Sequence, residues 1–229
     1  MPAPISIVIP TLNAGADLGR CAVALAEGLD AGLIRELVVS DGGSADTTLT
    51  IADELGANVV TGAASRGGQI GRGVAAAKAD WLMILHADTV LDPGWTQAVA
   101  LHLRDPARAG YFRLRFRAAG LAPRIVAGWA NLRARRAGLP YGDQGLVIHR
   151  DLLARVGGVP DLPLMEDVAL ARALRGRLVM LGATAATSAA RYQADGWTRR
   201  SLRNGLTLAR YLTGTPPERL RAGYSKTSN

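Results

Sequence analysis

The stretch Trp81-Leu82-Met83-Ile84-Leu85-His86-Ala87-Asp88 runs from apolar residues into an acidic one. Its apolar part is too short for a typical helix and predicts a buried central strand. A carboxylate at the carboxyl edge of such a strand lies where open α/β sheets bind ligands. Asp88 is therefore a candidate to hold a divalent cation against phosphates, because hard cations prefer oxygen ligands. Alternatively, Asp88 only caps the segment 89–94 that follows it.

The residues before this stretch alternate between predicted strands and predicted helices. We expect strands at 5–9, 36–40 and 58–61, and helices at 16–29, from Ser44 or Asp46 to Leu55, and at 69–78. This alternation is typical of a parallel, doubly wound sheet whose faces are covered by helices. The first 90 residues are thus predicted to be an α/β unit.

The residues after the stretch follow a different pattern. Phe112, Leu114 and Phe116 alternate with arginines, which predicts a half-buried strand at 111–117. Further strands are expected at 145–149 and 178–181, and helices at 93–103, 122–137, from Asp151, at 163–174, at 197–212 and from Pro216. The tail after Tyr224 is predicted to be disordered.

The composition points to anionic partners. The chain has 229 residues and a formal net charge of +8, and arginine supplies 25 of its 27 basic residues. Arginine suits bidentate contacts with phosphate, so nucleotides, nucleic acid or an anionic membrane are candidate partners. Few aromatic residues are available to stack on bases, and we expect no nucleic-acid partner. The single Cys21 excludes an internal disulfide, and we see neither a signal peptide nor a bilayer-spanning apolar stretch, so we expect a cytoplasmic protein.

Four polar motifs end predicted strands or begin predicted helices: Pro10-Thr11-Leu12-Asn13, Asp41-Gly42-Gly43-Ser44, His86-Ala87-Asp88 and Glu166-Asp167. In this order and spacing they resemble the family 2 glycosyltransferases over nearly the whole chain. The resemblance implies an α/β GT-A fold, a Rossmann-like and mostly parallel sheet flanked by helices. It also implies a single domain at 1–229, with a nucleotide-binding half at 1–92, an acceptor-binding half at 93–215 and a tail at 216–229.

Two further motifs narrow the resemblance. Gly142-Asp143-Gln144 and Pro163-Leu164-Met165-Glu166-Asp167 resemble a subgroup of small soluble glycosyltransferases associated with arsenosugar biosynthesis and radical enzymes. This likeness says little about the acceptor, and the sequence leaves the oligomeric state open.

The resemblance places the nucleotide at the first two motifs. Pro10-Thr11-Leu12-Asn13 would form a wall of the uridine pocket, and Asp41, beside Gly42, would accept from the uracil ring N–H. Each of these two motifs also has an interpretation that involves local structure alone. The first motif is otherwise an ordinary strand-ending turn, and the second an Asp-Gly turn followed by a helix cap.

His86-Ala87-Asp88 corresponds to the Asp-x-Asp metal motif of the family, with histidine in place of the first acid. The resemblance implies that Asp88 binds Mg²⁺ or Mn²⁺ and that His86 bonds the ribose or the diphosphate. Alternatively, the backbone satisfies the His86 ring at the end of its strand. Arg66, in a glycine-rich loop before a helix, and Arg191, after the last predicted strand, are candidates to contact the diphosphate. Each is otherwise a surface arginine.

Glu166-Asp167 opens a predicted helix, where acidic residues are favourable for electrostatic reasons alone. The resemblance implies that Asp167 is the catalytic base and that Glu166 orients the base or the acceptor. Asp143 and Gln144, in a polar loop before a strand, are expected to face the acceptor, and simple turn chemistry is their alternative.

Together these assignments predict a metal-dependent, inverting, hexosyltransferase-like enzyme. It would move a sugar from a nucleotide-diphosphate donor, with UDP expected, to a small-molecule or lipid-linked acceptor. Two alternatives stay open: a nucleotide-sugar binding protein without activity, and a nucleotidyltransferase on a similar fold.

The helix predicted at 197–212 is basic and amphipathic. It carries Leu202, Leu206 and Leu212, which we expect to pack on the core. The alternative is weak peripheral contact with an anionic membrane, which would suit a lipid-linked acceptor.

Overall fold

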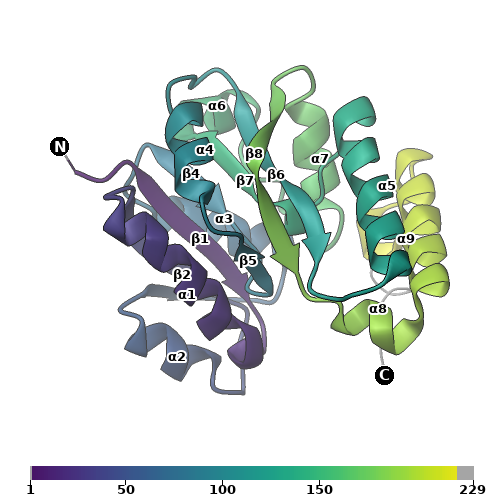
Figure 1. Ribbon diagram of the computed structural model, residues 1–229, viewed down its shortest axis with the longest axis horizontal. Helices are drawn as coiled ribbons and strands as arrows, with labels where there is room; N and C mark the ends of the chain where they lie inside the picture. Colours follow the sequence, from purple (N-terminus) through teal and green to yellow (C-terminus); the bar gives the residue numbers. More distant parts are fainter. Residues whose placement is uncertain (1, 221–229) are drawn as a thin grey trace.

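The computed structural model describes residues 2–220, which fold around one curled sheet flanked by helices (Figure 1). Within these residues the sheet has eight strands in the order β3-β2-β1-β4-β7-β6-β8-β5. The strands are β1 (Ile5–Thr11), β2 (Ile34–Asp41), β3 (Asn58–Thr61), β4 (Trp81–Ile84), β5 (Thr89–Leu91), β6 (Ala109–Phe116), β7 (Leu146–His149) and β8 (Leu178–Thr187). The helices are α1 (Gly15–Asp30), α2 (Thr48–Glu54), α3 (Arg66–Ala76), α4 (Trp95–His102), α5 (Leu121–Ala137), α6 (Arg150–Arg155), α7 (Glu166–Ala173), α8 (Ala190–Asp195) and α9 (Trp197–Leu212), with a 3₁₀ turn, η1 (Gly142–Gln144), before β7.

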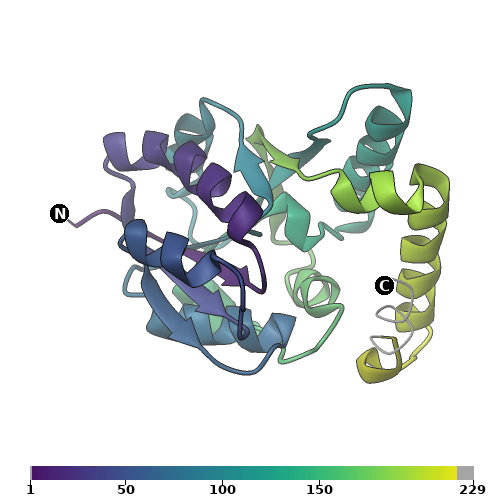
Figure 2. The same cartoon turned by 90° about the horizontal axis from the view of Figure 1, so that it is seen from below.

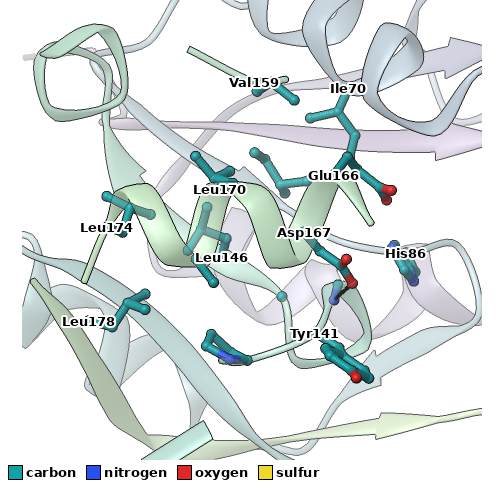
Figure 3. Close-up of a pocket in the computed structure, with 15 residues that line it drawn as sticks. Ile70, His86, Tyr141, Leu146, Val159, Glu166, Asp167, Leu170, Leu174 and Leu178 are labelled. Carbon is teal, nitrogen blue, oxygen red and sulfur yellow. Dashed lines mark hydrogen bonds between the residues drawn. The ribbon is translucent and has the colours of Figure 1, made fainter. Parts of the chain in front are cut away.

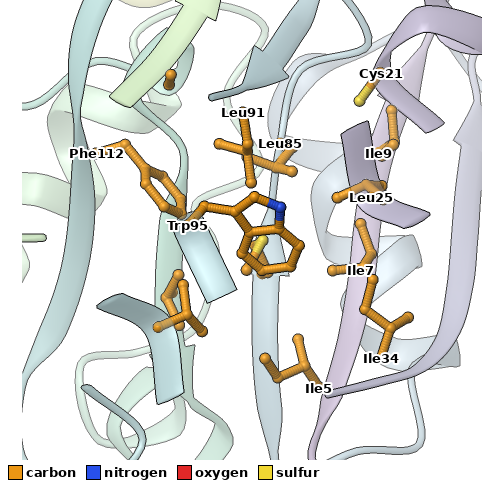
Figure 4. Packing of buried hydrophobic residues seen from close by; sticks show 14 of the residues in the cluster. Ile5, Ile7, Ile9, Cys21, Leu25, Ile34, Leu85, Leu91, Trp95 and Phe112 are labelled. Atoms are coloured by element: carbon orange, nitrogen blue, oxygen red, sulfur yellow. The ribbon is translucent and has the colours of Figure 1, made fainter. Parts of the chain in front are cut away.

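Strand β1 shows why the first half forms a sheet that is covered on both faces. Ile5, Ile7 and Ile9 belong to one buried cluster, which includes α1 side chains and Trp95 of α4 (Figure 4). Val8 belongs to a second cluster with residues of α3. Side chains alternate along a strand, so a strand buried on both faces needs apolar residues at nearly every position.

The pairing of β1 with its two neighbours determines where the ligand-binding edge of the sheet lies. β1 is parallel to β2 on one side and to β4 on the other. The chain therefore builds the sheet outwards through β2 and β3 and then returns to the opposite side of β1. Such a reversal places the carboxyl ends of β1 and β4 at the position where open α/β sheets bind ligands.

The second half brings further loops to this edge. β7 runs antiparallel to β4, and its first residue, Leu146, lies opposite Ile84, the last residue of β4. The end of the loop before β7 therefore lies beside the residues that follow β4. β8 is parallel to β6, and just beyond its end Ser188 donates its N–H to the Asp88 carbonyl at 3.2 Å. The sheet is thus parallel in its first half and mixed in its second.

Most predicted elements are confirmed, and α9 has the predicted bounds. Residues 89–91 form β5 rather than a capped segment after Asp88, because they pair antiparallel with β8. β8 continues to Thr187, beyond its predicted end at 181, because β6 and β5 supply partners on both sides. Helix α8 was not predicted, residues 217–220 are helical, and the tail after Tyr224 lies outside the described residues.

The prediction that the leucines of α9 pack on the core is wrong. Leu202, Leu206 and Leu212 are 64%, 50% and 47% exposed, whereas Arg200 and Thr207 of the same helix are buried. Arg200 is buried because it donates to Asp195 at 2.8 Å. Among residues 2–220 no helix is long and apolar enough to cross a membrane.

Candidate functional site

Six of the predicted site residues line one cavity of about 880 Å³, a volume typical of small-molecule sites. They come from five parts of the chain: Arg66, His86, Asp88, Asp143, Asp167 and Arg191. The cavity lies at the carboxyl edge of the sheet and continues between α5 and α9. Asp88 and Asp167, 79 positions apart in the sequence, therefore face the same space.

The backbone carbonyl of Asp88 accepts hydrogen bonds, whereas one oxygen of its carboxylate has no partner among residues 2–220. Its carbonyl accepts from the Ser188 N–H and from Arg117 Nη2 at 3.3 Å. Its Oδ1 is buried and accepts no hydrogen bond from residues 2–220. Burial raises the pKa of Asp88 above its usual range, opposed by the positive charge of Arg191. A buried carboxylate oxygen that lacks a donor is the kind of ligand a hard cation takes.

A cation at Asp88 would depend on the donor for most of its ligands. Within the described residues no cluster of three or more His, Cys, Asp or Glu side chains could hold a metal ion. Mg²⁺ commonly binds one or two carboxylates together with substrate phosphates and waters. The residues present therefore fit a cation that binds together with a diphosphate.

His86 is a neutral ring at the bottom of the site. Burial and the positive charge of Arg66 lower the pKa of His86 to about 3. Neither ring nitrogen makes a hydrogen bond within the described residues, so the structure gives no support to the backbone-satisfied alternative. The ring packs against Gly142, where an added Cβ would lie 2.4 Å from His86 Nε2. Ala87, by contrast, is buried in the core cluster and does not line the cavity.

Two backbone N–H groups donate hydrogen bonds to the Asp167 carboxylate and fix its position. Its Oδ1 accepts from the Val168 N–H at 2.8 Å, and its Oδ2 accepts from the Gly142 N–H at 2.9 Å. The second bond ties the start of α7 to the loop before β7. Figure 3 shows the Asp167 carboxylate between the Glu166 side chain and the Tyr141 ring, with His86 nearby. Asp167 thus presents a fixed carboxylate to the cavity.

Glu166, unlike Asp167, does not line the large cavity. It is 1% exposed and borders a small cavity of about 50 Å³ that is lined mainly by apolar residues, among them Ile70 and Leu170 (Figure 3). Neither of its carboxylate oxygens has a partner among the described residues. Burial, reinforced by the negative charge of Asp167, raises the pKa of Glu166 to about 7. Below pH 7 Glu166 therefore holds a proton beside the Asp167 carboxylate.

Glu166→Gln is expected to remove a pH dependence of stability. Between pH 4.5 and 7 the folded protein retains a proton on Glu166 that the unfolded chain releases, so the free energy of unfolding falls as pH rises. At pH 8 the variant should be more stable by about 3 kcal/mol at most, or roughly 5–10 °C in Tm. At pH 5 the two proteins should melt together. Differential scanning calorimetry across this range checks the prediction.

The matched control is Glu54→Gln, which changes an exposed glutamate of α2. It should melt like the wild type at both pH values. A Tm difference for Glu166→Gln that is the same at pH 5 and pH 8 would show that Glu166 is not protonated in the folded protein.

Tyr141, in the loop before β7, and Arg133 of α5 are cavity residues that the sequence prediction missed. The Arg133 guanidinium lies 3.4 Å from the centre of the Tyr141 ring, and both residues line the large cavity. Burial raises the pKa of Asp143 to about 6, opposed by the positive charge of Arg133. The sequence signal for Tyr141 was its position directly before Gly142-Asp143-Gln144. Arg133 lies on α5 and had no such signal.

The prediction that Gln144 faces the acceptor requires correction. Gln144 is fully buried and does not line the cavity. Its Nε2 donates to the Phe112 carbonyl at 3.1 Å, and its Oε1 accepts from the Tyr141 N–H at 3.4 Å. It therefore holds the loop against β6, and only Asp143 of this pair reaches the cavity.

The predicted nucleotide residues lie at the neighbouring strand ends, outside the described cavities. Asp41 is buried, and its carboxylate accepts four hydrogen bonds, from the Thr11 hydroxyl, the Gly43 and Ser44 N–H groups and the Ser44 hydroxyl. Burial opposes its ionisation, but these donors outweigh it and hold the pKa of Asp41 below its usual range. Four donors satisfy both oxygens, as expected for a residue that shapes its own turn.

Further hydrogen bonds tie the first motif to the second. Asn13 adopts a left-handed conformation with φ of 51° and accepts from the Ala45 N–H at 2.9 Å. Pro10 is half-buried in β1, and Leu12 is 50% exposed beside the loop. The Gly42 N–H donates to the Thr11 carbonyl, which keeps the two loops together at the sheet edge. Asp46 accepts from the Thr48 N–H at 3.0 Å, but the N-cap of α2 is Thr47, and this helix has no side-chain cap, contrary to the expectation for Ser44 or Asp46.

Two arginines flank the acidic centre of the cavity. Arg66 begins α3 and Arg191 lies on α8, so they approach from opposite halves of the chain. The positive charge of each opposes the rise that burial causes in the pKa of Asp88, and adds to the lowering that burial causes in the pKa of His86. The cavity therefore combines carboxylates that suit a cation or a proton with cationic groups that suit a diphosphate.

Comparisons with known proteins identify the family and a shared fold. A family model described as "Glycosyl transferase family 2" matches residues 6–130. Among solved structures, residues 1–349 of S. aureus TarS in complex with UDP-GlcNAc are similar, with a TM-score of 0.59 and 15% identity over 80% of this chain and 58% of that one. Glucosyl-3-phosphoglycerate synthase from Mycobacterium tuberculosis, in complex with Mn²⁺, UDP and glucosyl-3-phosphoglycerate, has a TM-score of 0.54 and 20% identity over 81% of this chain and 70% of that one.

These structural likenesses concern the fold. The chain spans about three fifths of the TarS structures that it matches at 58% and 63% coverage. A search among curated proteins found no match.

Proposed function

The chain belongs to glycosyl transferase family 2, and we propose that it transfers a sugar from a nucleotide-diphosphate donor, a UDP-sugar, to an acceptor with inversion at the anomeric carbon. One observation carries this proposal. Asp88 and Asp167 line the same cavity, with Arg66 and Arg191 beside them. This arrangement offers a site for the diphosphate and a base for the acceptor in one space.

The chemical step would be a single displacement. Asp167 takes the proton of the acceptor hydroxyl while its oxygen forms a bond to the anomeric carbon. The bond from that carbon to the diphosphate breaks on the opposite side, and UDP leaves with the electron pair. One displacement inverts the configuration. Cys21 does not offer a covalent route, because burial raises the pKa of its thiol to about 12.

The leaving diphosphate gains negative charge as the bond breaks. We propose that Arg66 and Arg191 bind this charge from the two sides of the cavity. Asp88 would hold Mg²⁺ or Mn²⁺, which supplies further charge neutralisation when bound. The unpartnered Oδ1 of Asp88 supports this assignment, as does Mn²⁺ in the similar mycobacterial structure.

The base of the nucleotide would bind at the ends of β1 and β2, beside Leu12 and Asn13. A uracil N–H that reaches Asp41 must replace one of the four donors already present. Two of these donors, the Thr11 and Ser44 hydroxyls, can be removed by the rotation of a side chain. The likeness to the arsenosugar-associated subgroup stays part of the proposal and rests on Gly142-Asp143-Gln144 and residues 163–167.

A thermal-shift screen tests the donor class. UDP-sugars, GDP-sugars and ADP-sugars are added with and without Mn²⁺ or Mg²⁺. A UDP-sugar at about 100 times its Kd should stabilise the protein by about 2.7 kcal/mol, or roughly 5–10 °C in Tm, and more with metal than without. Equal shifts for all nucleotides would contradict the donor assignment. Binding without release of UDP when acceptors are added would favour a non-catalytic protein, and a preference for UTP with a sugar phosphate would favour a nucleotidyltransferase.

A further inference from the structure

The cavity has an apolar mouth between α5 and α9 that the donor does not explain. Its lining there includes Ile125 and Trp129 of α5 and Leu202 of α9. These side chains are 51%, 69% and 64% exposed. Figures 1 and 2 show α5 and α9 at the side of the molecule away from β1 and β2. We call these three residues the α5–α9 mouth.

Both helices turn apolar side chains towards solvent. On α5, Leu121, Ile125 and Trp129 recur every four residues, which places them on one face of the helix. On α9 the exposed leucines lie opposite the buried Arg200. Surface helices of globular proteins normally show the reverse arrangement. Within the described residues nothing covers these side chains.

The apolar mouth is surrounded by positive charge. Helices α5 and α9 together contain eight arginines and no acidic residue. Five of the arginines are exposed: Arg124, Arg135, Arg136, Arg199 and Arg210. An exposed apolar face flanked by basic residues is typical of helices that lie on anionic membranes.

We propose that the α5–α9 mouth docks on an anionic membrane and takes up the hydrocarbon chain of a lipid acceptor. The cavity continues from this mouth to Asp167, so the lipid head group can reach the base while its chain stays in the mouth. This inference rests on the proposed function.

The acids at the inner end select the type of head group. Asp143 and Asp167 both line the cavity, where burial, together with the negative charge of Asp167, raises the pKa of Asp143. Negative charges so placed disfavour a lipid phosphate as the nucleophile, and a base has a proton to remove only from a hydroxyl. The acceptor is therefore a lipid alcohol. Its oxygen forms the bond to the anomeric carbon, its proton passes to Asp167, and UDP leaves.

Vesicle flotation tests the docking surface. The full chain is mixed at low salt with vesicles of phosphatidylcholine alone, or with 30% phosphatidylglycerol added. We expect binding to the anionic vesicles that is at least 10-fold stronger than to the neutral ones and that weakens as salt rises. The double variant Ile125→Gln/Leu202→Gln should reduce this binding at least 10-fold. The matched control, Val23→Gln/Leu101→Gln, changes residues of α1 and α4 that are 76% and 65% exposed and should bind like the wild type.

Tryptophan quenching locates the mouth on the membrane. Trp129 is exposed, Trp197 is half-buried, and Trp81 and Trp95 are buried. Vesicles of lipids brominated on the acyl chain should quench the wild type, and Trp129→Phe should lose most of that quenching. Loss of the same binding in both double variants, or no binding to either vesicle, would overturn the docking proposal. So would a dimer that buries Trp129 in the absence of lipid.

The head-group inference has its own readout. With a UDP-sugar supplied, vesicles that contain diacylglycerol should yield glycolipid, and vesicles that contain a polyprenyl phosphate should not. Transfer to the phosphate alone would overturn the lipid-alcohol assignment. The vesicle experiments use no nucleotide, and the thermal-shift screen uses no lipid. Failure of membrane docking is therefore distinguishable from failure of the proposed sugar transfer.

Discussion

Asp167→Asn is expected to lower the rate of sugar transfer by about 10²–10⁴-fold, because an amide cannot take the acceptor proton. Asn has nearly the same shape, and one of its two terminal atoms still accepts a hydrogen bond from the backbone that now holds Asp167. The affinity for UDP should change little, since Asp167 acts on the acceptor and not on the nucleotide. Measuring UDP release together with calorimetric titration of UDP separates the two effects.

The control for this variant is Asp151→Asn, on an acid whose side chain is 72% exposed on α6. It should retain wild-type turnover and wild-type UDP affinity. If Asp167→Asn retains more than a tenth of the wild-type rate, another group removes the proton. Glu166 would then be the next candidate, because its pKa of about 7 suits a base near neutral pH.

Asp88→Ala is expected to abolish the metal dependence of donor binding and to lower kcat/KM by on the order of 100-fold or more. Asp88 provides the unpartnered buried oxygen beside the arginines that flank the cavity. Without it, Mn²⁺ should no longer increase the affinity for UDP. Titration of UDP in the presence of Mn²⁺, and again in the presence of EDTA, measures this difference directly.

The same assignment predicts a direction for the pH dependence. Burial raises the pKa of Asp88, and a carboxylate must lose its proton before it binds a cation. Metal-assisted UDP binding in the wild type should therefore weaken as pH falls through that raised pKa. Asp92→Ala is the matched control, because Asp92 follows the same strand region but pairs with the exposed Arg115. If Asp88→Ala shows the same metal response as the wild type, the assignment of the metal to Asp88 is wrong.

Much of the first half was predictable because its strands and helices are specified locally. The runs at 5–9 and 81–85 are apolar at nearly every position because both faces of their strands are buried. Polar residues at the ends of these strands mark the edge at which parallel sheets bind ligands. The family followed from these motifs, as did His86 and Asp88 as residues of the large cavity.

Contacts between distant residues decided what the sequence left open. Residues 182–187 contain small side chains with little strand signal, and they are a strand only because β6 and β5 pair with them. Gln144 lies in a short polar stretch that is typical of a turn, and its burial depends on the Phe112 carbonyl, 32 positions away.

The amino-acid sequence by itself determined the alternating elements, the bounds of α9 and the polar residues at the strand ends, because propensity and periodicity act within a few neighbouring residues. Only the tertiary structure decided which of two adjacent acids faces the large cavity: Asp167 does, whereas Glu166 is enclosed among apolar side chains. It also decided that α9 buries an arginine and exposes its leucines, because Asp195 holds Arg200 on the inner side. Both outcomes depend on partners far away or in another element, and a local pattern carries no information about them.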